Sequence, residues 1–318
     1  MENLHPKARR VSIADEQAQQ RLDNFLLREL KGVPKSHVYR LLRTGQVRVN
    51  GRRAKPDYRL AGGDEIRIPP VRQSAPGPQT RPGSRQQAAL QAAILHEDAE
   101  LLVLNKPAGW AVHGGSGVSL GVIEALRAMR PGERYLELVH RLDRDTSGCL
   151  LVARKPAALR ALHRALRAGE VDKRYLALLA GAWAGGERRV RLALQKNVLQ
   201  SGERMVRVAE EGREAESHFR PLKRFRGATL MEIAILTGRT HQIRVHAAHL
   251  GYPVLGDDKY GDREANRQFR SLGLKRMFLH AASLSFVHPG TGAALQVSAP
   301  LDAQLQMLLD KLDTLEKS

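Results

Sequence analysis

A charged segment between two apolar segments is the strongest constraint that this sequence places on its fold. Residues 140–148 read His-Arg-Leu-Asp-Arg-Asp-Thr-Ser-Gly, with apolar residues concentrated at 136–139 before them and at 149–153 after them. The flanking segments predict buried strands, and charged side chains between buried strands are costly unless they are paired or used in chemistry. The segment is therefore either a structural ion-pair network or a functional site.

The charge of the chain narrows the choice of partner. Lys and Arg number 52 against 33 Asp and Glu, which gives a net charge of +19, and the excess is spread along the chain rather than held in a tail. A positive field of this size favours a polyanion, and nucleic acid is the first candidate. An anionic membrane surface and a basic surface without a partner are the alternatives, although no basic amphipathic helix stands out.

The sequence predicts a cytoplasmic protein. No apolar run approaches the length of a membrane span, and the polar N-terminus lacks the apolar core of a secretory signal. Cys149 is the only cysteine, so neither an internal disulfide nor a thiolate zinc site can form in one chain. Because Cys149 lies in an apolar run, we expect a core residue rather than a nucleophile.

The first seventy residues predict a flexible arm followed by a small domain. Residues 1–10 are basic and are expected to form the arm, and residues 11–70 are expected to fold. Two segments in this domain have apolar residues at helical spacing, and the second has Ser36 as its N-cap and Gly45 as its end. A strand is expected at 65–68. The apolar helical positions are Leu22, Phe25, Leu26, Leu30, Val38, Leu41 and Leu42.

The segment after the second helix resembles a known RNA-binding domain. Residues 45–51 read Gly-Gln-Val-Arg-Val-Asn-Gly, and alternation that runs into Asn-Gly predicts a β-hairpin. Two short helices followed by such a hairpin resemble the S4 RNA-binding domain. Helix and hairpin would then present one basic face to RNA, formed by Arg40, Arg43, Arg48, Arg52 and Arg53.

The rest of the chain predicts a linker and a larger α+β domain. Residues 71–90 are rich in Pro, Gly, Ser, Gln and Arg and predict a flexible linker, and residues 91–318 are densely patterned. Strands and helices do not alternate regularly, which favours an α+β fold over a doubly wound sheet. Strands are expected at 101–104, 149–153, 175–179, 220–225, 229–236 and 278–286, and helices at 118–129, 157–167, 240–250 and 304–315.

No cofactor or metal motif is present in the sequence. The glycine-rich run at 114–117 lacks the lysine of a phosphate-binding loop, and no His-Glu-x-x-His occurs. His241 and His246 are five residues apart, which places them on different faces of a helix, and no carboxylate accompanies them. We therefore expect neither a cofactor nor a bound metal.

Five groups of charged and polar residues remain, at 106–113, 140–148, 173–177, 236–246 and 279–281. Singly, each is explained by a turn, a surface ion pair or a solvated strand edge. Together, in this order and spacing, they closely resemble the RluA-type pseudouridine synthases. The hallmark H-R-L-D-x-x-T-S-G is matched at 140–148, and a second, T-G-R-T-H-Q-I-R-V-H, is matched at 237–246. With the S4-like domain, the resemblance covers nearly the whole chain outside the arm and the linker.

The resemblance implies a mixed, mostly antiparallel sheet and a division of roles. Asp143 matches the family's essential aspartate, which acts as a nucleophile at C1′ of a uridine or as a base at C2′. Arg244 matches the arginine that pairs with this aspartate and keeps it ionised despite burial. Tyr175 matches the tyrosine that stacks on uracil and is proposed to take part in C5 proton removal, and Leu279 would supply an apolar wall. Asp145 is expected to be structural, as a cap or an ion-pair partner.

The implied substrate adds further expectations. A uridine in structured RNA must be flipped out before it can react, and Arg141 matches the family position that fills the gap. Lys106, Lys173 and Arg174 are expected to be phosphate contacts or strand-edge charges. Arg239 is a weaker candidate than Arg244 for pairing with Asp143, and a phosphate contact is its other expected role.

Within the family, the chain is most similar to members that modify large-subunit (23S) ribosomal RNA. That RNA, free or in an assembly intermediate, is the expected partner of a monomeric enzyme. A noncatalytic RNA-binding assembly factor is the main alternative, and the presence of Asp143, Tyr175 and Arg244 argues against it. A nuclease is a third reading, which the lack of metal-binding carboxylates or a suitably spaced histidine pair disfavours.

Overall fold

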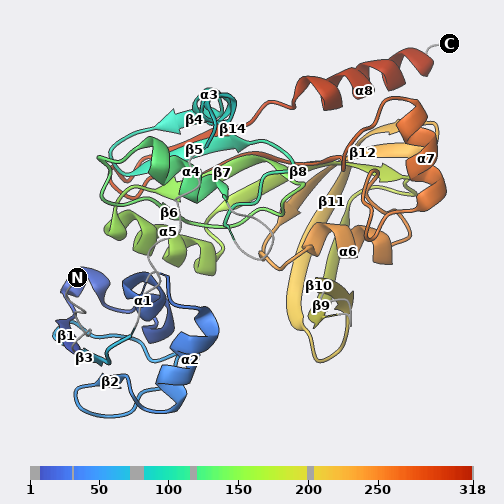
Figure 1. The fold of residues 1–318 in the computed structure, drawn as a ribbon. Helices are drawn as coiled ribbons and strands as arrows, with labels where there is room; N and C mark the ends of the chain where they lie inside the picture. The colour runs from blue at the N-terminus through green and yellow to red at the C-terminus, as the bar shows by residue number, and fades with distance from the viewer. Residues whose placement is uncertain (1–7, 31, 72–81, 115–119, 199–203, 317–318) are drawn as a thin grey trace. The chain divides into compact units, whose positions relative to one another are not determined.

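A computed structural model describes residues 8–30, 32–71, 82–114, 120–198 and 204–316 (Figure 1). The chain divides into two compact units, residues 1–80 and residues 81–318. Within the described residues, no helix combines the length and the apolar character needed to cross a lipid bilayer.

The N-terminal unit is a three-stranded sheet with two short helices. Its strands are antiparallel and lie in the order β1-β3-β2. The apolar helical residues named from the sequence are all buried in its core, together with residues of β2 and β3. The elements are β1 (Arg9–Ser12), the 3-10 helix η1 (Asp15–Gln17), α1 (Leu22–Glu29), α2 (Lys35–Arg43), β2 (Arg48–Val49) and β3 (Glu65–Ile68).

Two local expectations for this unit need correction, and a third is met. The predicted extent of the arm, residues 1–10, is wrong at its C-terminal end, because Arg9 and Arg10 lie in β1 and pair with β3. Residues 1–7 lie outside the described residues. Helix α2 starts one residue before Ser36, with Pro34 at its N-cap position and no side-chain cap. The end of α2 before Gly45, which has φ of +70°, is as expected.

The Asn50-Gly51 segment forms a tight turn but not an extended hairpin. Both residues have positive φ, of 49° and 77°, and the backbones of Val49 and Arg52 exchange two hydrogen bonds of 2.9 Å across the turn. The chain then leaves the sheet, so that β2 pairs with β3 instead of with a strand directly after the turn. The sequence signal therefore located the turn and misplaced the partner strand.

The expected linker over residues 71–90 is wrong at its C-terminal end. Residues Ser84–Ala92 form helix α3, with Leu90 fully buried. Residues 86–92 consist of Gln, Ala and Leu, which are strong helix formers, and the Gln86 side chain accepts a hydrogen bond of 3.0 Å from the Gly83 backbone amide at the helix start. The absence of an apolar period concealed a helix that buries a single leucine. Residues 72–81 of this segment lie outside the described residues.

The larger unit is built on an 11-stranded sheet within the described residues, and the expected α+β fold with a mixed, mostly antiparallel sheet is confirmed. The main path runs β10-β9-β11-β12-β8-β13-β7-β5-β4, with β14 beside β13 and β6 beside β7, and the pairing of β7 with β13 is parallel. The strands are β4 (Ile94–Glu97), β5 (Leu101–Lys106), β6 (Glu137–Leu138), β7 (Ser147–Ala153), β8 (Asp172–Ala180), β9 (Arg188–Val198), β10 (Arg204–Val208), β11 (Arg213–Phe225), β12 (Ala228–Ile235), β13 (Leu279–Val287) and β14 (Ala294–Ser298).

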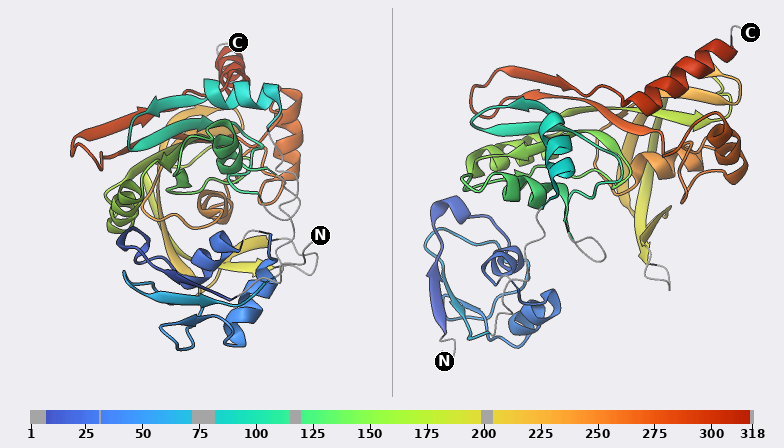
Figure 2. Two further views of the ribbon diagram at one scale, coloured as in Figure 1. Left: turned by 60° about the vertical axis from the view of Figure 1, so that its left-hand side comes forward. Right: turned by 45° about the horizontal axis from the view of Figure 1, so that its top comes forward.

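The sheet is strongly curved, and its helices lie around it. Figures 1 and 2 show β9, β10 and β11 running at a steep angle to β5, β7 and β13. Helix α6 packs against β9, β10 and β11, and α5 packs against β7. The sequence analysis did not anticipate β9, β10, β14 or α7. The helices are α3, already given, with α4 (Val122–Met129), α5 (Pro156–Ala168), α6 (Gln242–His249), α7 (Arg263–Ser271) and α8 (Ala303–Leu315).

Candidate active site

Strand register places four of the five sequence groups on one row across the centre of the sheet. Lys106 of β5 pairs with Gly148 of β7, and Gly148 pairs with Ala281 of β13. Ala281 pairs in turn with Tyr175 of β8, which pairs with Ile233 of β12. The fifth group leads into α6, which follows β12 directly in the chain. Segments far apart in the sequence therefore meet at one place.

Gly148 is required for this alignment. Its φ is +106°, and a Cβ atom built there would lie 2.2 Å from the carbonyl oxygen of Ala281. Any other residue would push β7 and β13 apart at their parallel contact, because the clash is with backbone that cannot move aside. The final glycine of the 140–148 motif is thus needed because the backbones of β7 and β13 approach each other closely there.

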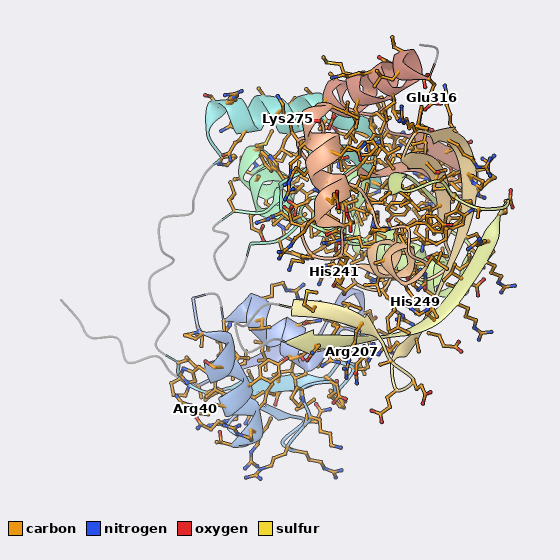
Figure 3. The ribbon with its side chains drawn as sticks, turned by 90° about the vertical axis from the view of Figure 1, so that its right-hand side faces the viewer. Arg40, Arg207, His241, His249, Lys275 and Glu316 are labelled. Carbon is orange, nitrogen blue, oxygen red and sulfur yellow. The ribbon has the colours of Figure 1, made fainter. Side chains whose placement is uncertain are left out.

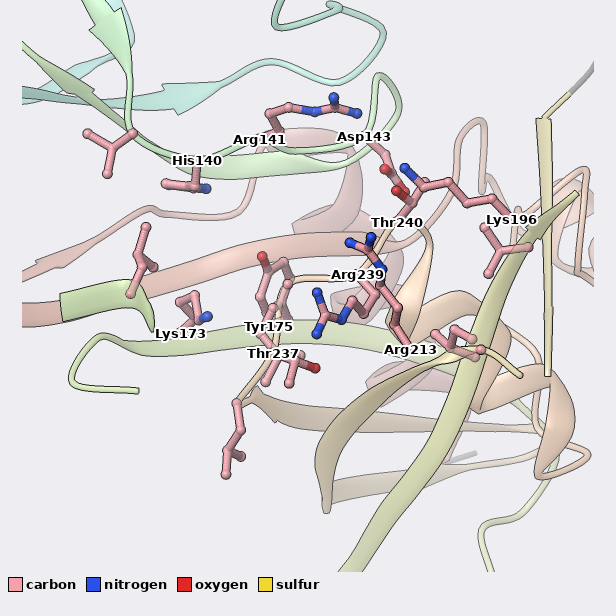
Figure 4. A pocket seen from close by; sticks show the side chains of 18 of the residues that line it. His140, Arg141, Asp143, Lys173, Tyr175, Lys196, Arg213, Thr237, Arg239 and Thr240 are labelled. Atoms are coloured by element: carbon pink, nitrogen blue, oxygen red, sulfur yellow. The ribbon is translucent and has the colours of Figure 1, made fainter. Parts of the chain in front are cut away.

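A cavity of about 880 Å³ opens beside this row. It falls in the size range of small-molecule sites and is large enough for a nucleotide. Asp143 and Tyr175 line it, and Figure 4 shows both side chains among the labelled residues of the wall. Among the described residues, its Lys and Arg side chains outnumber its carboxylates, which are Asp143 and Glu211; the basic ones are Arg141, Lys173, Lys196, Arg213 and Arg239.

Asp143 and Arg244 meet at the cavity, as the sequence predicted. Arg244 donates from Nη1 to Oδ2 of Asp143 over 3.4 Å, and the Asp143 side chain is 25% exposed while that of Arg244 is 7% exposed. The arginine comes from α6 and the aspartate from the turn before β7. The ion pair therefore joins two elements about a hundred residues apart, and its carboxylate end is open to a ligand.

A second carboxylate, Asp257, holds Arg244 more closely than Asp143 does. Arg244 donates from Nε and Nη2 to the two oxygens of Asp257 over 2.6 and 2.7 Å, and the Asp257 side chain is fully buried. Burial alone would raise the pKa of Asp257, but the hydrogen bonds and charge of Arg244, with the backbone amides of Lys259 and Tyr260, hold that pKa below its usual value. Asp257 thus fixes the guanidinium, and one edge is left to meet Asp143.

Asp257 and its neighbour Tyr260 are not among the site residues predicted from the sequence. They lie in the turn after α6, in the run Gly256-Asp257-Asp258-Lys259-Tyr260. The Arg244 guanidinium lies 5.0 Å from the centre of the Tyr260 ring, so the ring covers its face. A charged run directly after an apolar stretch at 253–255 was the available signal, and it is the same kind of signal that marked 140–148.

Tyr175 is a buried phenol at the cavity wall. It is 8% exposed on β8. Burial, reinforced by the charge of Asp143, raises the pKa of Tyr175 well above its usual value. Burial therefore favours the neutral hydroxyl form of Tyr175 over the phenolate.

Lys106 is not available for phosphate contact, which corrects the sequence-based expectation. It is 0% exposed, and its Nζ donates to the carbonyl oxygens of Pro107, Trp110 and Arg144 over 2.8, 2.9 and 2.9 Å. Burial lowers the pKa of Lys106 to about 7. The side chain ties the 106–110 loop to the turn that carries Asp143. The sequence could not distinguish this buried lysine from an exposed one.

We expect Lys106→Met to lower the free energy of unfolding by about 2–6 kcal/mol, because the carbonyls of Pro107 and Trp110 lose their donor and each such loss costs about 1–3 kcal/mol. The Arg144 carbonyl keeps its hydrogen bond from the Gly109 amide. Denaturant unfolding measures the change. Lys155→Met is the matched control, since Lys155 is 51% exposed in its ion pair with Glu100 and such pairs contribute little. Equal stability of the Lys106 variant and the wild type would contradict a tethering role.

The other predicted site residues divide into three groups. Arg141 and Arg239 are exposed and line the cavity, and Arg239 also donates from Nε to the carbonyl oxygen of Glu214 over 3.0 Å. Lys173 lines the cavity but is only 7% exposed, so it faces the interior rather than an outer strand edge. Leu279 is buried in the core and does not line the cavity, where Ile235 stands among the apolar residues instead.

The remaining predicted residues lie outside the cavity. Asp145 pairs with its neighbour Arg144 at 3.1 Å and has a 48% exposed side chain, so it is separate from the Arg244 pair. Arg174 pairs with Asp172 and Glu232 across β8 and β12. In the N-terminal unit the five predicted RNA-binding arginines are all exposed, and Figure 3 shows Arg40 on its helix. Within the described part of the chain, no group of three or more potential metal ligands occurs.

Two family models and several named relatives match this chain. The family model for RNA pseudouridylate synthases matches residues 100–249, and the model for the S4 domain matches residues 20–66. A protein named ribosomal large subunit pseudouridine synthase C from Escherichia coli (strain K12) is 54% identical over 315 residues, which cover 98% of this chain and 99% of the relative. The protein of the same name from Haemophilus influenzae is 51% identical, covering 97% of this chain and 96% of the relative.

Solved structures show the same relationship for the larger unit. The structure of human RNA pseudouridylate synthase domain containing 4 has a TM-score of 0.59 and 25% identity, and it covers 71% of this chain and 95% of that chain. Human RNA pseudouridylate synthase domain containing 1 has a TM-score of 0.57 and 28% identity, with coverage of 71% and 88%.

Proposed function

The chain belongs to the RNA pseudouridylate synthase family, and from that membership we propose that it converts specific uridines of large-subunit (23S) ribosomal RNA into pseudouridine. In this isomerisation the C1′–N1 bond of the uridine breaks and the uracil rotates. A C1′–C5 bond then forms, C5 loses its proton and N1 gains one. No electrons are exchanged with another molecule. The proposed substrate places the enzyme in the cytoplasm.

The position of Asp143 carries the proposal. A carboxylate is needed beside C1′ and C2′, and Asp143 lies in the wall of a nucleotide-sized cavity with Arg244 beside it. The guanidinium faces the carboxylate with the opposite charge and limits its rotation. Asp143 would then attack C1′ as a nucleophile or remove a proton from C2′, since either route uses a carboxylate oxygen.

The cavity wall offers a surface that can hold the detached uracil while it rotates. The buried Tyr175 ring offers a flat surface on which the detached base can stack while it turns. We assign Tyr175 to this stacking, and the resemblance to the family adds a part in the removal of the C5 proton. The basic side chains around the cavity suit the phosphates on either side of the flipped nucleotide.

RNA recognition is proposed to involve both units. Arg141, exposed at the cavity, is suited to occupy the space left by the flipped base. The exposed arginines of the S4 unit would add contacts to the RNA backbone, in keeping with the charge of +19. These contacts would extend the binding site well beyond one nucleotide.

Tritium release from RNA labelled at C5 of uridine tests the proposal. We expect the enzyme to release tritium from large-subunit ribosomal RNA, and not from small-subunit ribosomal RNA or transfer RNA at equal uridine concentration. The rate at subsaturating RNA should fall steeply as salt rises, because phosphate contacts release counterions. Release only from the small-subunit or transfer RNA would replace the proposed substrate, and release from none of the three would contradict the activity.

A further inference from the structure

His241 has a backbone conformation that its sequence position does not explain. It precedes α6 with φ of +53°, a left-handed conformation that is uncommon for residues other than glycine. Its side chain makes no cap hydrogen bond to the helix. Such strain persists only where surrounding contacts hold it, and it is concentrated at functional sites. Figure 3 shows His241 and His249 at opposite ends of this helix.

The contacts of Tyr260 favour one tautomer of the His241 ring. The backbone amide of Val206 donates to the Tyr260 hydroxyl over 2.8 Å, which leaves the hydroxyl its own hydrogen to donate. Nδ1 of His241 lies 2.8 Å from the same hydroxyl and accepts that hydrogen when the neutral ring carries its own on Nε2. In the other tautomer Nδ1 would donate, and the hydroxyl hydrogen would need a further acceptor, which no described residue supplies.

The protonated nitrogen of His241 faces the proposed essential aspartate. Nε2 lies 3.9 Å from Oδ2 of Asp143, and Arg244 approaches the same oxygen at 3.4 Å. The distance to His241 is longer than a hydrogen bond, but such contacts in ligand-free sites often shorten when substrate binds. No described residue donates to Oδ1 of Asp143. Arg244 and, at longer range, His241 therefore both approach Oδ2, and Oδ1 is left without a donor among the described residues.

The surroundings of His241 favour the neutral form of its ring. Burial lowers its pKa below the usual value, although the charge of Asp143 opposes this. Arg244 and Lys259 disfavour a further positive charge, while Asp257 favours it. A neutral ring adds a donor without adding charge.

We propose that His241, held as its Nε2–H tautomer by Tyr260, is a positioning residue that orients Asp143 so that Oδ1 faces the flipped uridine. The proposal rests on the proposed pseudouridine synthase activity. His241 does not line the cavity, so it acts through Asp143 and does not touch the nucleotide. The alternative is that the histidine serves only to pack the turn before α6.

Single-turnover tritium release, measured beside RNA affinity, separates these roles. We expect His241→Ala to slow the chemical step by about 10- to 100-fold, the usual effect of losing a hydrogen bond to a charged group, with RNA affinity unchanged. His241→Gln should recover most of that rate, because the amide nitrogen of glutamine lies as many bonds from Cα as Nε2 of histidine. Both variants carry the same backbone strain, so their difference isolates the donor.

Tyr260→Phe tests whether the tyrosine acts through the histidine. It should slow the chemical step in the wild-type background and have little effect in the His241→Gln background, where no tautomer remains to be fixed. His249→Ala is the control, since His249 is exposed at the far end of α6 and should retain the wild-type rate. Equal rates for His241→Ala and the wild type, or equal losses in the Ala and Gln variants, would overturn the proposal while leaving the activity in place.

Nitrogen-15 NMR of the histidine rings gives a readout that does not depend on activity. We expect the His241 signals of the ligand-free protein to report a neutral Nε2–H ring, and Tyr260→Phe to shift them toward a mixture of tautomers. A predominant Nδ1–H ring would overturn the positioning role. An inactive wild type would instead overturn the proposed function, whichever tautomer is found.

Discussion

Asp143→Asn is expected to reduce tritium release from large-subunit ribosomal RNA by more than about 10³-fold. The amide has nearly the same shape as the carboxylate, but it can neither attack C1′ nor take a proton from C2′. Folding should be preserved, because Asp257 still pairs with the Arg244 guanidinium through two hydrogen bonds. RNA affinity should therefore change little, and single-turnover kinetics with saturating enzyme will separate the chemical step from binding.

Asp145→Asn is the matched control for this substitution. Asp145 lies two residues further on in the same motif, but its side chain is half exposed and pairs with Arg144. An exposed pair of this kind is worth little, so we expect activity within about twofold of the wild type. If Asp145→Asn abolished activity and Asp143→Asn preserved it, the roles of the two carboxylates would have to be exchanged.

Asp257→Asn is expected to lower the free energy of unfolding by about 3–5 kcal/mol and to reduce activity strongly. The substitution leaves the guanidinium of Arg244 buried without its closest counter-charge, and breaking one partner of a buried pair costs about that much. Activity should fall because Arg244 would no longer be fixed where it meets Asp143. Denaturant unfolding of the full chain, followed in the larger unit, measures the loss of stability, and tritium release measures the loss of activity.

The difference in unfolding free energy between the wild type and Asp257→Asn should also shrink as the pH falls. The pKa of Asp257 is lowered in the folded protein from its ordinary value of 3.8, so its contribution is fully present above about pH 4 and is lost as the pH falls through the lowered folded-state value. Wild type and Asp257→Asn should therefore converge in stability in acid. Asp258→Asn is the control, because that side chain is 80% exposed and pairs with Arg270 at the surface. A stable and active Asp257→Asn variant would rule out the proposal that Asp257 fixes the Arg244 guanidinium.

The sequence was most informative about residues that lie within a recognisable family motif. The 140–148 segment made Asp143 the candidate for the essential aspartate, and the 237–246 segment made Arg244 the candidate for its partner, because each matches a hallmark of the family. Their meeting is confirmed by the ion pair between them. Hydrophobic periodicity also located most central strands and helices, since these elements bury a regular face.

What the sequence could not supply depends on contacts between distant residues. Asp257 becomes important only because the turn after α6 returns it to Arg244, and Tyr260 only because it bridges Val206 and His241. Lys106 was misjudged because charge does not reveal burial. Helix α3 was missed because one buried leucine gives no period.

The parallel contact between β7 and β13 also has a consequence for biosynthesis. It joins Ser147 to His280, which are separated by 133 positions, and it lies in the row that carries Tyr175. A contact of such high order has a large loop-closure cost and forms late in folding. Because translation proceeds from the N-terminus, the sheet cannot close until β13 has left the exit tunnel. A newly made chain therefore cannot catalyse the reaction until most of its length has been synthesised.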